Sequence, residues 1–543
     1  MDFASSSPRR PRPQLRESPG VSSGMLKIKS LFAALTVMLG AAVSLVLNAA
    51  PAQASHTQTA LFEEDYGLLA DPYGTMRNLH NLGVGRARVY MEWSAIAPSP
   101  RSSRKPAHFN SADPNAYGRA WGPYDAIVNA ARLYNVDLDF LLTGGAPFWA
   151  DGPGVPSSGR NVHFAWRPST GEYRNFVHAV AARYPSVHNW EIWNEPNFGE
   201  DLGPQAVNGS RTSVGPSLYR GLLDAGFSAL QSTGHGDDTI VFGQLSARGM
   251  AGPANRSHPQ GLPGNFAQTK PLAFLRALYC VDGSFRQLRG RAAASVGCPT
   301  NAAGSRRFGA DHPALFRSSG FGIHPYPQGL PPTQESSSDP DYVAFPEIPR
   351  LERTLDRLLR IYGSGRHYNI YNNEYGYVTR PPARGNFASP ATASLYINWA
   401  EYLSWRDPRL VTSMQYLFFD PAVGGPSQFY SGLANSNGRL KDTFYAYRMP
   451  LFLPVTSTRR GHSLEVWGAV RPTHSFPHGA QAEIQFQRNS RGSFTTVRRL
   501  SITSPQGYFD LRVTFPASGS VRVRWVGANG AAIYSRVNRI TVR

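Results

Sequence analysis

Two glutamates follow strand-like runs and have neighbours suited to carboxylate chemistry. Glu195 lies in HNWEIWNEPN, where Pro196 ends the apolar run because proline cannot donate to a strand ladder. Glu374 lies in YNNEYGY, where Gly376 lets the chain turn. If the two carboxyl groups converge to about 5–5.5 Å, one can protonate a leaving oxygen while the other attacks an anomeric carbon, as in retaining glycoside hydrolysis.

A lone glutamate is usually a surface or capping residue, so this interpretation depends on the elements that would bring the pair together. Between residues 60 and 450, strand-like runs alternate with amphipathic helical runs, which predicts parallel strands joined by helices. Eight such units predict an α/β fold of the (β/α)8 TIM barrel type, whose strand carboxyl ends share one mouth. The alternative is an open doubly wound sheet, although no Gly-rich phosphate loop follows the first strand. The predicted strands are 60–69, 83–93, 136–149, 188–197, 239–247, 320–327, 368–377 and 411–421, and the predicted helices are 126–134, 173–184, 218–230, 350–362 and 392–404.

The two glutamates follow the fourth and seventh predicted strands, so barrel closure would bring them to one mouth. A pleated strand would place residues 191, 193 and 195 on one side, and Trp190 on the other, under a helix. Aromatic side chains at strand ends could stack on sugar faces. These aromatic candidates are Trp149, Trp190, Trp193, His324, Tyr326 and Tyr375.

Two insertions interrupt the regular spacing of strands and helices. Residues 248–319 and 327–346 are rich in glycine and proline, and each follows a predicted strand. Insertions at strand carboxyl ends are expected to rim a binding cleft. The first one holds Cys280 and Cys298, the two cysteines of the chain, and in an exported protein such a pair predicts a disulfide.

After Pro454 the chain changes to period-two alternation, with Gly, Pro and Ser turns between short runs. This pattern predicts a small all-β sandwich over residues 455–543 as an accessory domain. The segment has 13 arginines and three acidic residues, hence a net charge of +10. One interpretation of these charges is that they form a solvated face of a domain that braces the barrel. The other is that they retain the protein on an anionic cell-wall or substrate polymer.

The bulk composition excludes disorder, since 41% of the 543 residues are hydrophobic and 12% aromatic. The net charge of +19 comes mostly from arginine and could indicate nucleic acid or an acidic polymer. No basic run is interleaved with aromatic residues in the manner of nucleic-acid binding, so no nucleic-acid partner is expected.

Residues 1–54 are predicted to be an N-terminal extension and signal peptide. A basic start after Met25, an apolar run over 31–47 and the small-x-small sequence at 52–54 are typical of an export signal. Cleavage there would give a secreted, extracellular protein with no membrane attachment, whereas an uncleaved anchor is the alternative. Translation from Met1 and from Met25 are both compatible with the sequence.

The stretches IWNEPN and NNEYGY, together with RVYMEWSAIAP, HPYP and SGLANSNGRLKDTFYAYR, resemble the retaining glycosidases of glycoside hydrolase clan A over about residues 60–450. Within the clan the pattern is most similar to family 39, the β-xylosidase and α-iduronidase family, and to the cellulase-like family 5. The resemblance implies that Glu195 is the acid/base and Glu374 the nucleophile of a double displacement. It implies no metal and no organic cofactor.

The resemblance also implies roles for neighbouring residues. Asn194 matches the asparagine that binds the sugar 2-hydroxyl, and Arg88 matches an arginine near the nucleophile. Tyr326 matches the tyrosine that hydrogen-bonds the nucleophile, with His324 beside it. Where the clan often carries a tryptophan after its last strand, this chain has two phenylalanines. The candidate substrate-binding residues are Asn194, Arg88, His324, Tyr326, Trp149 and Phe419.

The expected function is therefore that of a secreted retaining glycoside hydrolase acting on a polysaccharide or its oligosaccharides. The sequence does not determine the sugar, the linkage, or exo versus endo action. The rival interpretation is a non-catalytic carbohydrate-binding barrel that the basic sandwich docks to an anionic wall polymer. Both carboxylate positions are intact, which favours the enzyme.

Overall fold

The computed structural model describes most of the chain after residue 57. The described residues are 58–156, 162–206, 213–250, 267–335, 337–425, 427–473, 476, 479–527 and 529–543. The predicted signal peptide lies outside these residues. None of the described helices combines the length and the apolar character needed to cross a membrane.

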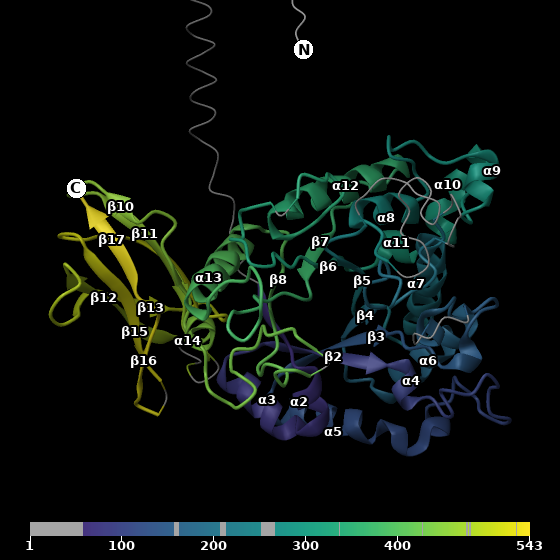
Figure 1. Ribbon diagram of the computed structural model, residues 1–543, viewed down its shortest axis with the longest axis horizontal. Coiled ribbons are helices and arrows are strands. Elements are labelled where there is room, and N and C mark those ends of the chain that lie inside the picture. Colours follow the sequence, from purple (N-terminus) through teal and green to yellow (C-terminus); the bar gives the residue numbers. More distant parts are fainter. Residues whose placement is uncertain are drawn as a thin grey trace, which may run out of the picture. The chain divides into compact units, whose positions relative to one another are not determined.

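Eight parallel strands form the central sheet, in the order β7-β6-β5-β4-β3-β2-β1-β8, and helices lie around its outside (Figure 1). The ring closes between its end strands, because Ile370 N–H donates to Arg409 O at 2.7 Å and Val411 N–H donates to Ile370 O at 3.0 Å. The predicted (β/α)8 barrel is therefore confirmed. The barrel strands are β1 Thr59–Glu63, β2 Arg86–Glu92, β3 Asp137–Thr143, β4 Asn189–Ile192, β5 Thr239–Ser246, β6 Gly320–His324, β7 Asn369–Asn372 and β8 Thr412–Tyr416.

The helices follow the predicted amphipathic runs, with ends set by capping residues. The side chains of Ser169 and Ser389 accept backbone N–H groups at the starts of α6 and α13. The first predicted strand is wrong in its second half, because residues 65–70 form α2, with Asp65 in the first turn where a carboxylate is favoured. The helices are α2 Asp65–Ala70, α3 Pro72–Asn81, α4 Trp93–Ile96, α5 Gly122–Tyr134, α6 Thr170–Arg183, α7 Gly215–Ser232, α8 Pro271–Leu278, α9 Gly290–Ala294, α10 Ala302–Asp311, α11 Ala314–Arg317, α12 Ile348–Ile361, α13 Pro390–Arg406 and α14 Asp442–Arg448, with 3-10 turns η1 Pro114–Trp121, η2 Phe148–Ala150, η3 Val162–Ala165 and η5 Phe345–Glu347.

The C-terminal segment forms two packed sheets, as predicted. One sheet has the order β10-β17-β15-β12-β13 with β16 beside β15, and the other has the order β14-β11-β9. Alternate side chains such as Val466, Ile484 and Val523 are fully buried between them, as period-two sequences require. The strands are β9 Leu451–Phe452, β10 Ser457–Thr458, β11 Ser463–Ala469, β12 Ala480–Arg488, β13 Thr495–Ile502, β14 Tyr508–Thr514, β15 Gly519–Val526, β16 Ala532–Tyr534 and β17 Asn538–Val542.

A buried polar contact joins the sandwich to helix α13 of the barrel. Arg471 is 3% exposed and forms an ion pair with Glu401, and the Tyr508 hydroxyl donates to the same carboxylate at 2.8 Å. Trp467 packs beside this contact, with its ring 5.5 Å from Tyr402. Breaking a buried ion pair from one side leaves an uncompensated charge, so these residues are expected to hold the two parts together.

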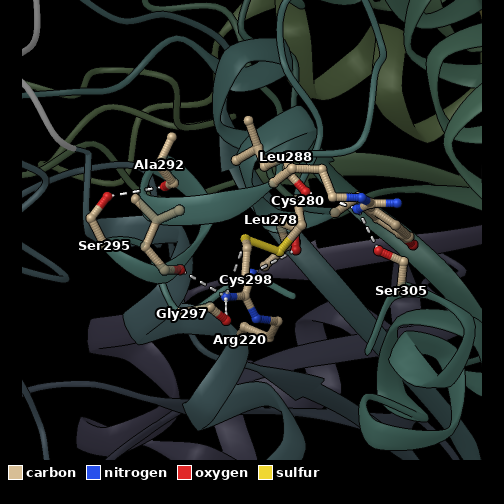
Figure 2. The surroundings of a disulfide bond; sticks show 12 residues. Arg220, Leu278, Cys280, Leu288, Ala292, Ser295, Gly297, Cys298 and Ser305 are labelled. Atoms are coloured by element: carbon tan, nitrogen blue, oxygen red, sulfur yellow. Dashed lines mark hydrogen bonds between the residues drawn. A yellow bond between two sulfur atoms is a disulfide. The ribbon is translucent and has the colours of Figure 1, made fainter. Parts of the chain in front are cut away.

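Cys280 and Cys298 form the predicted disulfide, which lies in the first insertion (Figure 2). The side chain of Arg220, on helix α7, supports the loop from below. It donates to Leu278 O at 2.9 Å and to Gly297 O at 2.9 Å. This guanidinium is satisfied by carbonyl oxygens, and its burial lowers its pKa to about 10.

Replacing both Cys280 and Cys298 by serine should lower the free energy of unfolding by about 3 kcal/mol, because the disulfide closes a loop of sequence separation 18. Urea denaturation of the variant beside the wild type measures the difference. Alkylation of both thiols in the native, unreduced protein would show that the bond does not form in solution.

Candidate active site

The guanidinium of Arg88, on β2, is fully buried at the carboxyl end of the barrel. Its Nε donates to Glu191 Oε2 at 2.9 Å, and its Nη1 forms an ion pair with Glu63 and lies 3.4 Å from Glu374 Oε2. Burial raises the pKa of Glu63 and of Glu191 well above the ordinary value, and Arg88 opposes this rise. One cation thus holds carboxyl groups contributed by β1, β4 and the end of β7.

The same guanidinium also determines which ring nitrogen of His324 carries the proton. Arg88 Nη2 lies 3.5 Å from His324 Nε2, and it donates to Asn194 Oδ1 at 3.4 Å. Because a guanidinium can only donate, Nε2 of the imidazole must accept, and the proton of the neutral ring lies on Nδ1. Burial lowers the pKa of His324 to about 4, so the ring is neutral at physiological pH.

His324 Nδ1 lies between the two glutamates. It is 3.0 Å from Glu195 Oε1 and 3.1 Å from Glu374 Oε2. These two oxygens are therefore no more than about 6 Å apart, which is closer to the about 5–5.5 Å of retaining glycosidases than to the wider spacing of inverting ones. The structure thus brings together the two glutamates that the sequence singles out.

The two carboxyl groups have different surroundings. Burial raises the pKa of Glu195 to about 7, so it can hold a proton near neutral pH. Burial also raises the pKa of Glu374, but His324 and Arg88 oppose the rise. In addition, the Tyr326 hydroxyl donates to Glu374 Oε1 at 2.8 Å. Glu374 therefore has the contacts that stabilise a carboxylate.

A turn after β4 aims Glu195 toward this centre. Trp193 and Glu195 have positive φ values of 65° and 33°, so the pleat stops at the end of the strand. Glu191 points into the barrel, whereas Trp193 packs on Tyr173 of helix α6 and donates to Asp201 O at 3.2 Å. The expectation that residues 191, 193 and 195 share one side is therefore wrong, because the left-handed backbone at 193 breaks the alternation.

Gly144 and Trp190 pack beside this turn, and the size of each side chain suits its place. Gly144 faces the Trp193 ring, and a Cβ there would lie 2.9 Å from it, so only glycine leaves room. Trp190 is buried on the helix side of β4, as predicted, and its indole N–H donates to Asp238 Oδ2 at 3.0 Å.

The glutamates open into a cleft of about 480 Å³. Asn194 and Tyr326 line it beside them, and the two insertions contribute Arg248, Gln268 and Gln328 to its rim, as expected. Aromatic and apolar surface comes from loops after β7 and β8. These further lining residues include Val378, Phe387 and Phe429.

Four of the six candidate substrate-binding residues do not line the cleft. Arg88 and His324 are fully buried and contact the glutamates, whereas Trp149 and Phe419 lie elsewhere. Trp149 donates its indole N–H to Pro98 O at 3.1 Å, packs edge-to-face on Trp93, and does not line the cleft. Phe419 is 40% exposed beside Phe418 and is also not among the lining residues. Both sit on loops whose path depends on tertiary packing rather than on the local pattern.

Some site residues have only weak signals in the sequence. Phe429 lies 13 residues beyond the end of β8, and its ring is 4.9 Å from that of Tyr326, but nothing local marks it. Glu63 and Glu191 lie within strands, and a charged residue in an otherwise apolar run is the signal that could have found them.

Within the described part of the chain, one cluster has the spacing of metal ligands, and it lies outside the cleft. The ligand atoms of His188, His235 and Asp238 are within 4.8 Å of one another. The Asp238 carboxylate already interacts with both histidines, at 2.9 and 2.6 Å. Hydrogen bonds from the two histidines to Asp238, the residue just before β5, explain this arrangement.

Comparison with known proteins gives no match among protein-family models and none among curated proteins. Among solved structures, the chain is similar to a family 39 glycoside hydrolase from Bacteroides cellulosilyticus WH2, with 13% identity, a TM-score of 0.44, and coverage of 86% of this chain and 80% of that one. It is also similar to a glucosidase from Croceicoccus marinus, with 11% identity, a TM-score of 0.43, and coverage of 90% and 98%. A GH30 endoxylanase from Clostridium papyrosolvens C71 has 10% identity and a TM-score of 0.42, with coverage of 85% and 95%. Because these TM-scores are low, the barrel is identified from the strand order and the closure of the sheet in this protein.

The raised pKa of Glu195 makes stability depend on pH in a predictable direction. The folded state holds this proton more tightly than the unfolded state, so the stabilisation is present below about pH 4.5 and is lost as pH rises through about 7. Glu195→Gln removes this titration. As the pH rises from about 4.5 to about 7, the free energy of unfolding of the wild type should therefore fall by about 3 kcal/mol relative to that of the variant. Urea denaturation from pH 4 to pH 8 measures this fall, and a difference that stays constant would contradict the buried environment of Glu195.

Proposed function

We propose that this protein is a retaining glycoside hydrolase of the clan A type, which cleaves O-glycosidic bonds of a polysaccharide or oligosaccharide. The observation that carries the proposal is the single His324 Nδ1 within 3.1 Å of both glutamates, at the mouth of a (β/α)8 barrel. The short spacing of the carboxyl groups favours double displacement over a single displacement by water. The predicted signal peptide favours secretion as its location.

In the first step, a carboxylate oxygen of Glu374 attacks the anomeric carbon while the bond from that carbon to the leaving oxygen breaks. Glu195 gives its proton to the leaving oxygen, which departs as an alcohol. In the second step, Glu195 takes a proton from water, and the resulting hydroxyl attacks the anomeric carbon and releases Glu374. Glu195 ends protonated and ready for the next cycle.

The assignment of roles rests on the contacts of each carboxyl group. Glu374 receives the Tyr326 hydroxyl and lies within 3.4 Å of Arg88, so its ionised form is the better stabilised. The pKa of Glu195, near 7, suits a group that must lose and regain a proton at neutral pH. Asn194 accepts from Arg88 through Oδ1 and hydrogen-bonds the Asp201 carboxyl group, so one N–H of its NH₂ group remains to donate to a sugar hydroxyl in the cleft.

Replacing Glu195 by glutamine should lower kcat on the order of 10²–10⁴-fold, and Glu374→Gln should lower it by several powers of ten, while both variants remain folded. For Glu374→Ala, azide should restore turnover and give a glycosyl azide of inverted configuration. In the wild type, kcat/KM should fall as pH rises above about 7, because Glu195 then loses the proton that it must donate.

A panel of aryl β-xyloside, β-glucoside, β-mannoside and α-arabinofuranoside serves as substrates, with circular dichroism as the control for folding. A fully active Glu374→Ala variant would contradict the assignment of the nucleophile. Sugar binding without turnover of any glycoside would favour the rival, a non-catalytic carbohydrate-binding barrel.

We also propose that the basic sandwich holds the enzyme on an anionic polysaccharide. Arg522 and Arg524 point to the same face of β15, and the guanidinium of Arg522 lies 4.0 Å from the Phe494 ring centre and 4.1 Å from that of Tyr534. Glu483 pairs with Arg524 and with one neighbouring arginine. Most of the +10 charge of the segment therefore stays available to a polyanion.

Full-length protein should bind a polyanionic polysaccharide matrix at 0.1 M salt and be released at 1 M, because the Debye length falls from about 10 Å to about 3 Å. The triple variant Arg498→Gln, Arg522→Gln and Arg539→Gln should be released at lower salt than the wild type. The matched control removes the same charge from exposed arginines of the barrel. These control substitutions are Arg77→Gln, Arg132→Gln and Arg174→Gln. Equal release of both triple variants would leave bracing of the barrel as the role of the sandwich.

A further inference from the structure

Arg248 is half-buried in the cleft, and within the described residues no carboxylate forms an ion pair with it. It lies two residues beyond β5 and lines the cleft that contains Glu195 and Glu374. Within the described residues it makes no ion pair or hydrogen bond. By contrast, Arg88 contacts three carboxyl groups and Arg220 donates to three carbonyl oxygens.

The surroundings of Arg248 make an anion the natural partner. Its side chain is half-buried, and this burial lowers its pKa. Tyr342 and Glu347 raise that pKa from a distance, but within the described residues neither side chain forms a hydrogen bond or ion pair with Arg248. Because a cation withdrawn from water without a paired charge is unfavourable, a ligand carboxylate placed against it would gain a charge-assisted, two-pronged contact.

Apart from Glu195 and Glu374, the other lining residues are uncharged and suited to sugar hydroxyls. Gln268, Gln328 and Gln428 all line the cleft, and none of their side chains hydrogen-bonds another described residue. Amide groups both donate and accept, as recognition of hydroxyls requires. Arg248 is the one cation among the described residues that line the cleft, which Glu195 and Glu374 also line.

We propose that Arg248 is a specificity residue that binds the carboxylate of a hexuronic acid unit, so that the substrate is an acidic glycan. The inference rests on the proposed function for the identity of the cleft. A carboxylate suits the site better than a neutral substituent, since the planar guanidinium donates two parallel N–H groups to its two oxygens. The net charge of +19 would steer such a polyanion toward the protein.

The test uses full-length protein carrying Glu195→Gln, so that the oligosaccharides persist. Tetramers from pectate, alginate and hyaluronan are titrated calorimetrically, each beside its carboxyl-reduced counterpart. At least one acidic tetramer should bind about ten- to a hundred-fold more tightly than its reduced form. Adding Arg248→Gln should remove that preference, and Arg248→Lys should retain part of it because the charge remains without the fork.

Two matched substitutions separate this site from general charge effects. Arg77→Gln on helix α3 and Arg132→Gln on helix α5 remove one exposed charge each outside the cleft, and should leave tetramer binding unchanged. Thermal melts of the Arg248 variants check that they fold. If no acidic tetramer is preferred over its reduced form, or if Arg248→Gln keeps the preference, the proposal is wrong.

The outcome is distinguishable from failure of the proposed function. Turnover of glycosides that is lost with Glu374→Gln, together with equal binding of each acidic tetramer and its carboxyl-reduced form, would keep the glycosidase and overturn the role of Arg248. Conversely, binding of an acidic tetramer that depends on Arg248, with no turnover of any glycoside, would keep the carboxylate site and overturn the enzyme.

Discussion

The arrangement of side chains at the carboxyl end of the barrel depends on one buried cation. Arg88 contacts Glu63, Glu191 and Glu374, and its remaining donors face His324 and Asn194. These partners come from strands far apart in the sequence, so a single guanidinium fixes their relative positions. Removal of such a cation would leave carboxyl groups buried without compensation, which is far more costly than the loss of a surface ion pair.

The same cation limits how many carboxyl groups can ionise together. Burial raises the pKa of Glu63, Glu191, Glu195 and Glu374, and one guanidinium cannot balance four negative charges that are largely withdrawn from water. Some of them must stay protonated near neutral pH. A centre that retains protons in this way is suited to acid catalysis, and the neutral His324 between the glutamates adds no charge of its own.

Polar groups are used differently in the two parts of the chain. At the carboxyl end of the barrel, charged groups are buried and hydrogen-bonded, and they fix the positions of Glu195 and Glu374. In the sandwich, Arg471 is buried against Glu401 to hold the parts together, while Arg522 and Arg524 remain on an outer sheet face. The cleft lies between these extremes, because Arg248 is half-buried there and forms no ion pair with any residue that the structure describes.

Local pattern alone determined much of this protein. Alternating strand and helix periods specify the barrel, period-two runs specify the sandwich, and Pro196 and Gly376 place the two glutamates at strand ends, because each is a consequence of backbone geometry within a few residues. Tertiary structure decided the rest. The left-handed turn at Trp193, the cleft position of Phe429 and the absence of Trp149 from it depend on packing between segments distant in the chain. The periodicity of a sequence predicts on which face of a helix or strand a side chain lies. It does not predict which side chain from a distant loop will contact it.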